Sequence, residues 1–469
     1  MAKKVAAAGP IEGRWTLPAG WSWYRARDIA KIVGGSTPKN AADTTNYSED
    51  GTPWLTPADL SGYNKATIGA GRRNLAPHVV NRSSLLPAGA VLISSRAPVG
   101  YCAVASNPMV TNQGFRSLVL ADGIDPFFIR YYVLFSRKYL EDHASGTTFK
   151  ELSGGALGDL VFPIPPREVQ RTIVARIDEL FAEIDDGEAA LVRARDDLAT
   201  WRKALLKAAV TGELTVDWRA ANPSSESGAE LLAHVAADLP PRKPRKPGVP
   251  SRAGEPVAMP FAVPSNWAWT TLDQIINSGP TNGYSPKRST DGEGTQALKL
   301  TATTAGRLKL DSNCVKVLSE TIPAGSPLYL NSGDLLFQRG NTREYVGMAA
   351  VYDGPPNKYI YPDLMIRVTL PDEALTQWVW RWAVSPHGRH YLMDAAQGGA
   401  GTMPKISGQT LRSMPVPLPP ATELKFILAE LERLTAETEA GHDDLRLASV
   451  TPATLRQSIL AAAFRGELV

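Results

Sequence analysis

Two long stretches of the chain carry apolar residues every three or four positions, which is the spacing of an amphipathic helix. The apolar seam of the first stretch consists of Ile173, Ile177, Leu180, Ile184, Leu191, Leu198, Trp201 and Leu205. Apolar a/d spacing over about five heptads predicts a coiled coil. The double proline Pro165–Pro166 allows a helix to begin there, and Gly212 can end it. A helix of about 40 residues predicts a rod of roughly 60 Å.

The second stretch repeats the first at a constant offset of 254 positions. LLKAAVTGEL at 205–214 resembles ILAAAFRGEL at 459–468, and FPIPP at 162–166 resembles VPLPP at 416–420. The second seam consists of Ile427, Leu431, Leu434, Leu445, Leu455 and Ile459. Pro452 predicts a break or kink, because proline lacks the amide hydrogen that a helix interior needs. We expect the two apolar stripes to pack on each other, although each helix could instead pack only on its own domain.

Upstream of each long helix the two halves of the chain also correspond, but with gaps. LPAGWSW at 17–23 resembles VPSNWAW at 263–269, and GSTPK at 35–39 resembles GYSPK at 283–287. Short apolar runs bounded by Gly, Pro, Asn and Ser, such as FRSLVL from Phe115, predict strands. DPFFIRYYVLFSRKYLEDHA and EALTQWVWRWAVSPHGRHYL predict aromatic-faced helices. The chain is therefore a tandem duplication of a mixed α/β unit, each of roughly 150 residues and each followed by a long helix.

The predicted fold class is thus α/β (α+β), with two recognition domains, two long spacer helices that form a coiled coil, and an internal pseudo-twofold repeat. The predicted segments are 1–165 for the first domain, 166–214 for the first spacer helix, 215–262 for a proline-rich basic linker, 263–419 for the second domain and 420–469 for the second spacer helix. Within the linker, AELLAHVAAD is expected to form a short helix.

Composition and motifs narrow the class of protein further. The net charge is only +3, which permits nucleic-acid binding without arguing strongly for it. No signal-peptide core or run of about 18 apolar residues appears, and the two cysteines suggest a reducing compartment, so a cytoplasmic location is expected. The sequence has no phosphate loop, no G-x-G-x-x-G motif, no G-x-S-x-G elbow and no zinc spacing. Halves that keep one frame and vary elsewhere are typical of two recognition modules.

The loops between the predicted strands are rich in side chains that can contact DNA. Arg can pair with guanine, and Asn or Gln with adenine, whereas Lys and hydroxyl groups more often contact phosphates. In the first unit the candidates are Ser36, Thr37, Lys39, Arg72, Arg73, Arg96, Asn112, Gln113 and Lys150. In the second unit they are Ser285, Lys287, Arg288, Gln338, Arg339, Asn341, Arg343 and Lys405. The prediction depends on the whole set, because a single polar loop residue is more often merely solvated.

Over nearly its whole length, the chain resembles the DNA-specificity subunit of type I restriction–modification systems. The resemblance lies in the LPAGWSW and VPSNWAW openings, the LPAGAVLISSRAPVG and NQGF segments, the FPIPP and VPLPP exits and the TGEL and RGEL ends. It implies two target-recognition domains that each read one half of a bipartite site in double-stranded DNA, with half-sites roughly 34 Å apart. It also implies that the two spacer helices pair antiparallel.

The same resemblance implies a non-catalytic subunit that binds two methyltransferase subunits and two endonuclease–translocase subunits. S-adenosylmethionine, ATP and Mg²⁺ are then expected on those partners, and this chain is expected to bind no cofactor. The second unit departs from the pattern at Tyr361, where YPDL stands in place of the NQG of the first unit. Two alternatives stay open, namely a DNA-specificity module of another modification or defence complex, and a scaffold of two domains on a coiled coil that binds proteins.

Overall fold

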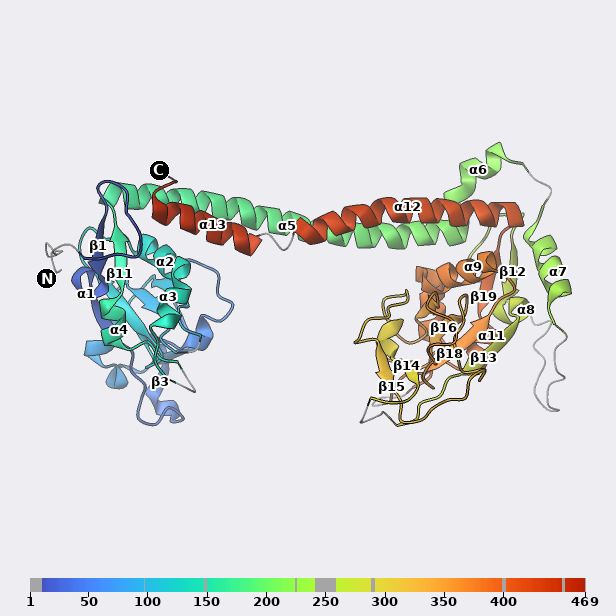
Figure 1. The fold of residues 1–469 in the computed structure, drawn as a ribbon, viewed down its shortest axis with the longest axis horizontal. Coiled ribbons are helices and arrows are strands. Elements are labelled where there is room, and N and C mark those ends of the chain that lie inside the picture. The colour runs from blue at the N-terminus through green and yellow to red at the C-terminus, as the bar shows by residue number, and fades with distance from the viewer. Residues whose placement is uncertain are drawn as a thin grey trace. The chain divides into compact units, whose positions relative to one another are not determined.

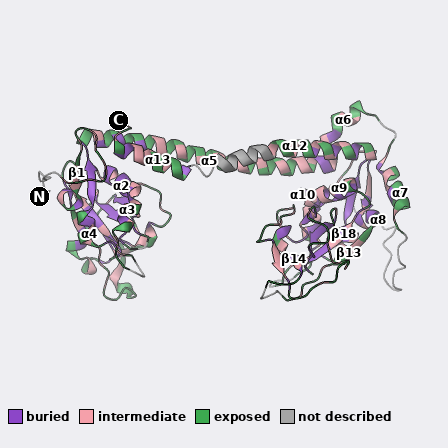
Figure 2. Ribbon diagram, in the orientation of Figure 1, coloured by how far each residue is buried: buried purple, intermediate pink, exposed green. Residues whose placement is uncertain are grey.

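The computed structural model describes residues 11–96, 98–146, 150–223, 226–240, 259–287, 292–398, 402–448 and 452–468, without the side chains of 439–448. The chain forms two compact units, the first comprising 1–192 with 445–469 and the second comprising 193–444. Helix α5 (Arg167–Thr211) therefore contributes its first half to one unit and its second half to the other. In Figure 2 buried residues are concentrated in the strands of each unit, whereas exposed residues follow the long helices.

The first unit contains a five-stranded sheet of order β2-β10-β7-β8-β4, a four-stranded sheet of order β5-β3-β9-β6, and the pair β1–β11. Its strands are β1 (Ser22–Arg25), β2 (Ala30–Gly34), β3 (Tyr47–Leu55), β4 (Thr67–Ile68), β5 (Arg73–Leu75), β6 (Leu85–Leu86), β7 (Val91–Ile93), β8 (Cys102–Ala105), β9 (Met109–Thr111), β10 (Arg116–Leu120) and β11 (Val161–Ile164). Its shorter helices are α1 (Ala26–Ile29), α2 (Pro126–Phe135), α3 (Arg137–Asp142) and α4 (Gly154–Asp159). The apolar run that begins at Phe115 forms β10, as predicted.

The second unit contains a four-stranded sheet of order β13-β18-β16-β17 and the pairs β12–β19 and β14–β15 (Figure 1). Its strands are β12 (Ala268–Thr271), β13 (Ser278–Asn282), β14 (Gln296–Leu298), β15 (Val315–Val317), β16 (Leu335–Gln338), β17 (Ala349–Val351), β18 (Met365–Thr369) and β19 (Pro415–Leu418). Its shorter helices are α6 (Val216–Ala221), α7 (Gly228–Asp238), α8 (Leu272–Ile275), α9 (Glu373–Val384), α10 (Pro386–Asp394) and α11 (Gly408–Arg412). Helix α7 covers the short helix predicted in the linker, and it packs on the unit through the buried Val235.

Strand register confirms the internal repeat. In the antiparallel pair β1–β11, Ser22 faces Ile164, and in β12–β19, Ala268 faces Leu418. Ser22 and Ala268 are as far apart in the sequence as the two opening motifs, and Ile164 and Leu418 are as far apart as the two exit motifs. The aromatic segment of each unit forms two helices in succession, α2 with α3 and α9 with α10. The second of these breaks falls before Pro386, whose ring cannot continue α9.

The long helices pair antiparallel within each unit. In the first unit, α13 (Pro452–Arg465) packs on the first half of α5, with Arg456 bound to Asp185 and Glu188, and with Phe464 in the same core as Ile173. In the second unit, α12 (Ala421–Ala448) packs on the other half of α5, with Leu424 in the same core as Ala209. Helix α12 ends at Ala448 and α13 begins at Pro452, where the sequence predicted a break.

The predicted seam is only partly buried. Ile173, Ile177, Ile427 and Leu431 are fully buried, and Leu180, Ile184, Leu191, Leu198, Leu205, Leu434 and Ile459 are half-buried. Trp201 and Leu455 are 37% and 45% exposed, which corrects their assignment to the seam. An α-helix drifts by about 20° per heptad relative to a strict seven-residue repeat, so a seam extrapolated along the helix rotates out of the interface. Leu445 lies among residues whose side chains are not described.

Helices α5 and α13 each end against the opening motif of a unit. Gly212, after α5, and Gly466, after α13, have φ angles of 78° and 77°. A Cβ on Gly212 would lie 2.5 Å from Cγ of Pro264, and one on Gly466 would lie 2.4 Å from Cγ of Pro18. Pro18 and Pro264 occupy equivalent places in LPAGWSW and VPSNWAW, so the two repeated GEL segments contact equivalent prolines.

A buried carboxylate fixes the start of α12 in the second unit. Glu423 is 1% exposed and accepts hydrogen bonds from Thr215 at 2.6 Å, Arg219 at 2.7 Å and the Trp267 indole at 2.9 Å. The stacked rings of Trp218 and Phe426, with centroids 5.0 Å apart, add to this contact. Among the residues that the structure describes, no helix is long and apolar enough to cross a bilayer.

Candidate nucleic-acid interface

In the first unit the loop after β2 is held against the loop after β9. The amide of Ser36 donates to the last carbonyl of β9 at 2.7 Å. A Cβ added to Gly35 would lie 1.8 Å from the carbonyl oxygen of Asn112, so this close approach requires glycine. The hydroxyl of Thr37 donates to the side-chain oxygen of Gln113. The structure therefore brings together four of the predicted residues, Ser36, Thr37, Asn112 and Gln113.

Three charged side chains lie beside this turn. Nε of Arg96 donates to one carboxylate oxygen of Glu151, and Nη2 of Arg116 donates to the other, both at 3.1 Å. Arg116 also donates from Nη1 to the carbonyl oxygens of Gln113 and Phe115, at 3.0 and 2.8 Å. Glu151 therefore connects Arg96, a predicted DNA contact, to the turn that carries Gln113.

The other predicted residues of the first unit are surface residues. Arg72 is exposed and lies 3.7 Å from a carboxylate oxygen of Asp59. Arg73 begins β5 and faces Trp54 on β3, whose indole donates to the carbonyl of Ser36 at 3.0 Å. Arg73 is thus joined through one strand pair to the turn described above. The remaining candidates Lys39 and Lys150 are exposed.

The second unit builds the same turn from different residues. The amide of Tyr284 donates to the carbonyl of Tyr361 at 2.9 Å, and a Cβ on Gly283 would lie 2.1 Å from that carbonyl oxygen. The hydroxyl of Ser285 accepts from the amide of Asp363 at 3.2 Å. The YPDL segment thus occupies the place of NQG and has the carboxylate of Asp363 where the first unit has an amide side chain, whereas its Tyr361 ring is buried.

Arg339 and Lys405 lie next to this second turn. Arg339 Nη1 is 3.5 Å from the carbonyl oxygen of Asp363. Lys405 exchanges two backbone hydrogen bonds with Gln397, each 2.9 Å long, and pairs on its other side with Gly340. The structure therefore brings together Ser285, Arg339 and Lys405 from three separate parts of the sequence.

Gln338 is not available to DNA, which corrects its prediction as a contact. It is fully buried at the end of β16, and its amide nitrogen donates to the carbonyl of Leu300 at 2.9 Å and the hydroxyl of Thr303 at 3.0 Å. Asn341 donates in turn to the side-chain oxygen of Gln338 at 2.6 Å. These bonds satisfy a buried amide and attach the 300–304 segment to the sheet, which is a structural role.

Three other predicted residues of the second unit contribute less to the cluster. Arg343 is exposed, and its Nη2 lies 3.9 Å from a carboxylate oxygen of Asp394. Lys287 is exposed, and its carbonyl accepts the amide of Ser319 at 3.0 Å. Arg288 lies outside the described residues.

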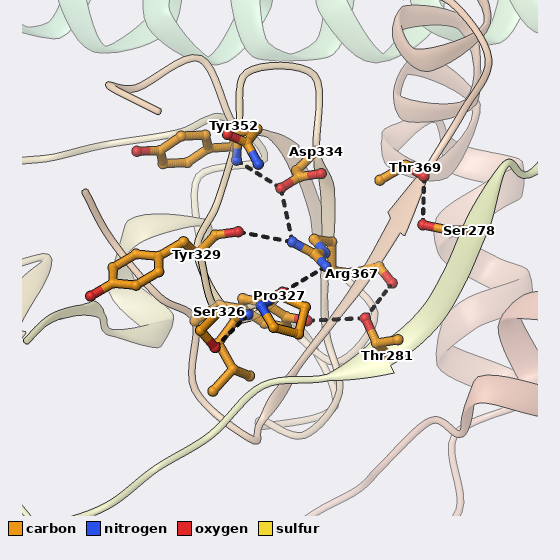
Figure 3. A network of polar contacts seen from close by, with 12 residues as sticks. Ser278, Thr281, Ser326, Pro327, Tyr329, Asp334, Tyr352, Arg367 and Thr369 are labelled. Carbon is orange, nitrogen blue, oxygen red and sulfur yellow. Dashed lines mark hydrogen bonds and ion pairs between the residues drawn. The ribbon is translucent and has the colours of Figure 1, made fainter. Parts of the chain in front are cut away.

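A second polar network in this unit serves the fold. Arg367 on β18 donates to the carbonyls of Tyr329 at 3.0 Å and Pro327 at 2.9 Å, and to the carboxylate of Asp334 at 3.3 Å (Figure 3). Burial raises the pKa of Asp334, although the Arg367 charge acts in the opposite direction. A neighbouring cavity of about 400 Å³ is lined by carboxylates that would repel phosphates, from Asp334, Asp353, Asp372 and Glu373.

The described residues offer little for metal or thiol chemistry. No group of three His, Cys, Asp or Glu side chains in this part of the chain could hold a metal ion. Burial raises the pKa of Cys102 to about 12, so its thiol stays neutral.

Reasoning from the sequence missed two residues of the first unit, Glu151 and Arg116. A signal for one of them was present, because the offset of 254 positions places Glu151 opposite Lys405, which was predicted as a contact. Arg116 lies in an apolar run that predicted only a strand. Its link to Glu151 is a contact between residues 35 positions apart, which local patterns do not reveal.

Comparison with known proteins shows which proteins this chain is similar to. Residues 18–192 match a family profile described as a type I restriction modification DNA specificity domain. The MjaIX type I restriction enzyme specificity subunit of Methanocaldococcus jannaschii is 39% identical over 173 residues, which cover 35% of this chain and 39% of that protein. The EcoKI type I restriction enzyme specificity subunit of Escherichia coli is 25% identical over 96% of this chain and 90% of that protein.

Solved structures show the same fold. A chain from a study of complex assembly and conformational transition in a type I restriction–modification system matches with a TM-score of 0.65 over 97% of this chain and all of that one, at 17% identity. The HsdS subunit from Thermoanaerobacter tengcongensis matches with a TM-score of 0.53 over 97% of this chain and 99% of that one, also at 17% identity. Residues 18–192 thus match the type I restriction modification DNA specificity domain, and nearly the whole chain is similar to specificity subunits of type I restriction enzymes.

Proposed function

We propose that this chain is the DNA-binding subunit of a type I restriction–modification complex and that it reads a bipartite, interrupted site with one unit per half-site. One observation carries this proposal. The same loop turn, built on Gly35 in the first unit and Gly283 in the second, recurs with the same backbone contacts but different side chains. A retained frame with changed side chains is what two readers of different sequences require.

The chemistry of the two clusters supports contacts in the major groove. Arg96 and Arg339 can offer paired donors to guanine, and Asn112 or Gln113 can pair with adenine. Lysines and hydroxyl groups suit phosphate oxygens, which fix register without reading sequence. The proposed phosphate contacts are Ser36, Thr37, Lys39, Arg72, Arg73, Lys150, Ser285, Lys287, Arg343 and Lys405.

We further propose that the chain is non-catalytic and that its long helices dock two methyltransferase subunits and, through them, two endonuclease–translocase subunits. S-adenosylmethionine, ATP and Mg²⁺ would act on those partners. The repeat supports docking of one kind of partner twice, because Trp201 and Leu455 stand at equivalent positions and are both exposed. Recurrence of an exposed apolar side chain at the same position of both repeats supports docking of a partner at that position.

The test is methylation mapping in cells that carry this gene with its genomic neighbours, compared with cells in which this gene alone is deleted. Loss of an interrupted two-part methylation motif on deletion is the expected result, and it would also reveal the target. Unchanged methylation beside an active neighbouring methyltransferase would refute the proposal. Binding of the full chain to DNA that does not weaken as salt rises would count against phosphate contacts in either unit.

A further inference from the structure

Glu151 and Lys405 occupy the same place in the two units. Glu151 exchanges backbone hydrogen bonds of 2.8 and 3.1 Å with Ser145, and Lys405 exchanges two of 2.9 Å with Gln397. The two residues are also separated by the 254 positions that relate the repeated helices. Backbone geometry and sequence offset therefore agree that a glutamate of the first unit is replaced by a lysine in the second.

The residue across the ladder differs as well. Arg96 pairs with Glu151 in the first unit, and Gly340 pairs with Lys405 in the second. The register is the same, because the residues next along the chain, Leu152 and Ile406, each donate an amide at 2.8 Å to the residue before Arg96 or Gly340. An arginine facing a carboxylate in one unit thus corresponds to a glycine facing an ammonium group in the other.

The third member of the cluster is also absent from the second unit. Arg116 faces Gly34 across β10–β2, and Ile366 faces Asn282 at the equivalent place on β18–β13. The first unit thus has a carboxylate held between two guanidinium groups. The second unit has an isoleucine in place of Arg116 and a single lysine in place of Glu151.

Resting on the proposed function, we propose that Glu151 is a positioning residue that aims Arg96 at a base of the first half-site, and that Lys405 contacts phosphate at the equivalent place in the second. Arg116 is 22% exposed and is anchored by two carbonyls, so Glu151 is itself held in place. Arg96 is 48% exposed and uses Nε for the ion pair, which keeps its terminal nitrogens accessible. A guanidinium fixed before binding loses less entropy when it reads guanine.

This proposal predicts that removing the charge of Glu151 changes two quantities in opposite directions, the affinity for unrelated DNA and the discrimination between bases. Glu151 places a negative charge where DNA phosphates would approach, so its removal should strengthen binding to unrelated DNA. The same removal frees Arg96 to adopt other rotamers, so discrimination at its base should fall. A purely structural role for Glu151 would instead weaken binding to all sequences, and a purely repulsive role would strengthen binding to all sequences alike.

The experiment measures binding of the full-length chain to duplexes in which each half-site is randomised in turn. Arg96→Lys and Glu151→Gln should both lose about 10- to 100-fold discrimination at the same base pair. Glu151→Gln should also raise affinity for unrelated DNA a few-fold, and the double variant should discriminate no worse than Arg96→Lys. The matched control Lys405→Gln should weaken binding to all sequences and lower the salt slope by about 1.

The unchanged half-site serves as an internal check of folding, because the preference read by the second unit must survive in every variant of the first. Wild-type preference retained in Glu151→Gln, or equal weakening on every sequence, would overturn the positioning role. A change of base preference in Lys405→Gln would overturn the phosphate role of that residue. A wild-type chain without any base preference would instead refute the proposed function, so the two failures are distinguishable.

Discussion

Three glycines of the long helices should respond to alanine in opposite directions. Gly466 ends α13 with a φ of 77°, and Gly212 ends α5 with a φ of 78°. Gly187 lies inside α5, and a Cβ there would meet nothing within 4 Å. Alanine is therefore unfavourable at Gly212 and Gly466, where the backbone is left-handed. At Gly187 it only replaces a residue that forms helices poorly.

The magnitudes follow from these geometries. An L-residue in the left-handed region costs about 1–2 kcal/mol. The added Cβ would also lie 2.4 Å from Pro18 in Gly466→Ala and 2.5 Å from Pro264 in Gly212→Ala, which forces a shift that costs about 1–3 kcal/mol. Each variant should therefore lose at least about 2 kcal/mol of local stability. Gly187→Ala should gain about 0.5–1 kcal/mol, because alanine loses less backbone entropy in a helix.

Hydrogen exchange followed by mass spectrometry measures this unit by unit, which avoids treating a two-unit chain as two-state. A loss of 2 kcal/mol raises the opening constant about 30-fold. The increase should appear in first-unit peptides for Gly466→Ala and in second-unit peptides for Gly212→Ala. Unchanged exchange in both terminal variants would refute the assignment of Gly212 and Gly466 as required helix ends. Faster exchange around α5 in Gly187→Ala would refute the expected stabilisation at that position.

Three further predictions test the contacts of the helices. Phe464→Ala should cost about 3–5 kcal/mol in the first unit, because the ring is fully buried in an aromatic cluster. Leu455→Ala, on the exposed side of the same helix, should cost under about 1 kcal/mol, and hydrogen exchange of first-unit peptides distinguishes the two variants. Glu423→Gln should cost about 3 kcal/mol in the second unit, since it removes the charge shared by Arg219 and three other donors, Thr215, Asn266 and the Trp267 indole. Hydrogen exchange of second-unit peptides measures this loss. A hydrogen bond from Arg456 lowers the pKa of Glu188. This half-exposed ion pair therefore stabilises the first unit at pH values above the ordinary glutamate pKa, and the stabilisation is lost as the pH falls. The wild type should be more stable than Arg456→Gln by under about 1 kcal/mol, and unfolding curves measured in acid should show that this difference vanishes.

The sequence predicted the frame of this protein, meaning its helices and paired strands, well for a physical reason. Helices and strand pairs that pack on each other tolerate no insertion, so the offset of 254 positions survives from Phe162 and Val416 to the chain end. Ile164 and Leu418 are related by this offset, and each pairs with the equivalent residue of an opening motif, Ser22 or Ala268. Short buried strands were predictable because their apolar runs are bounded by turn residues.

The loops were harder to predict because they do accept insertions. Gly100 donates its amide to Ser94 across six residues, whereas Gly347 donates to Gln338 across nine. The sequence does not show where the three extra residues lie, so Arg96 could not be matched to Gly340. The exposure of Trp201 was equally hidden, since a heptad pattern does not show how far a seam rotates.

The division between frame and loops also explains how such a chain can acquire new specificity. The bonds that define each cluster join residues of the loops and of the adjoining strand ends, as between Ser36 and the end of β9 or between Arg96 and Glu151. The bonds that define the frame join helix ends to the opening motifs, as at Gly466 and Pro18. A change such as Glu151 to the lysine found at 405 alters the charge of a cluster but leaves its backbone ladder in place. Recognition can therefore diverge between the units without disturbing the helices, on which the proposed docking of two identical partners depends.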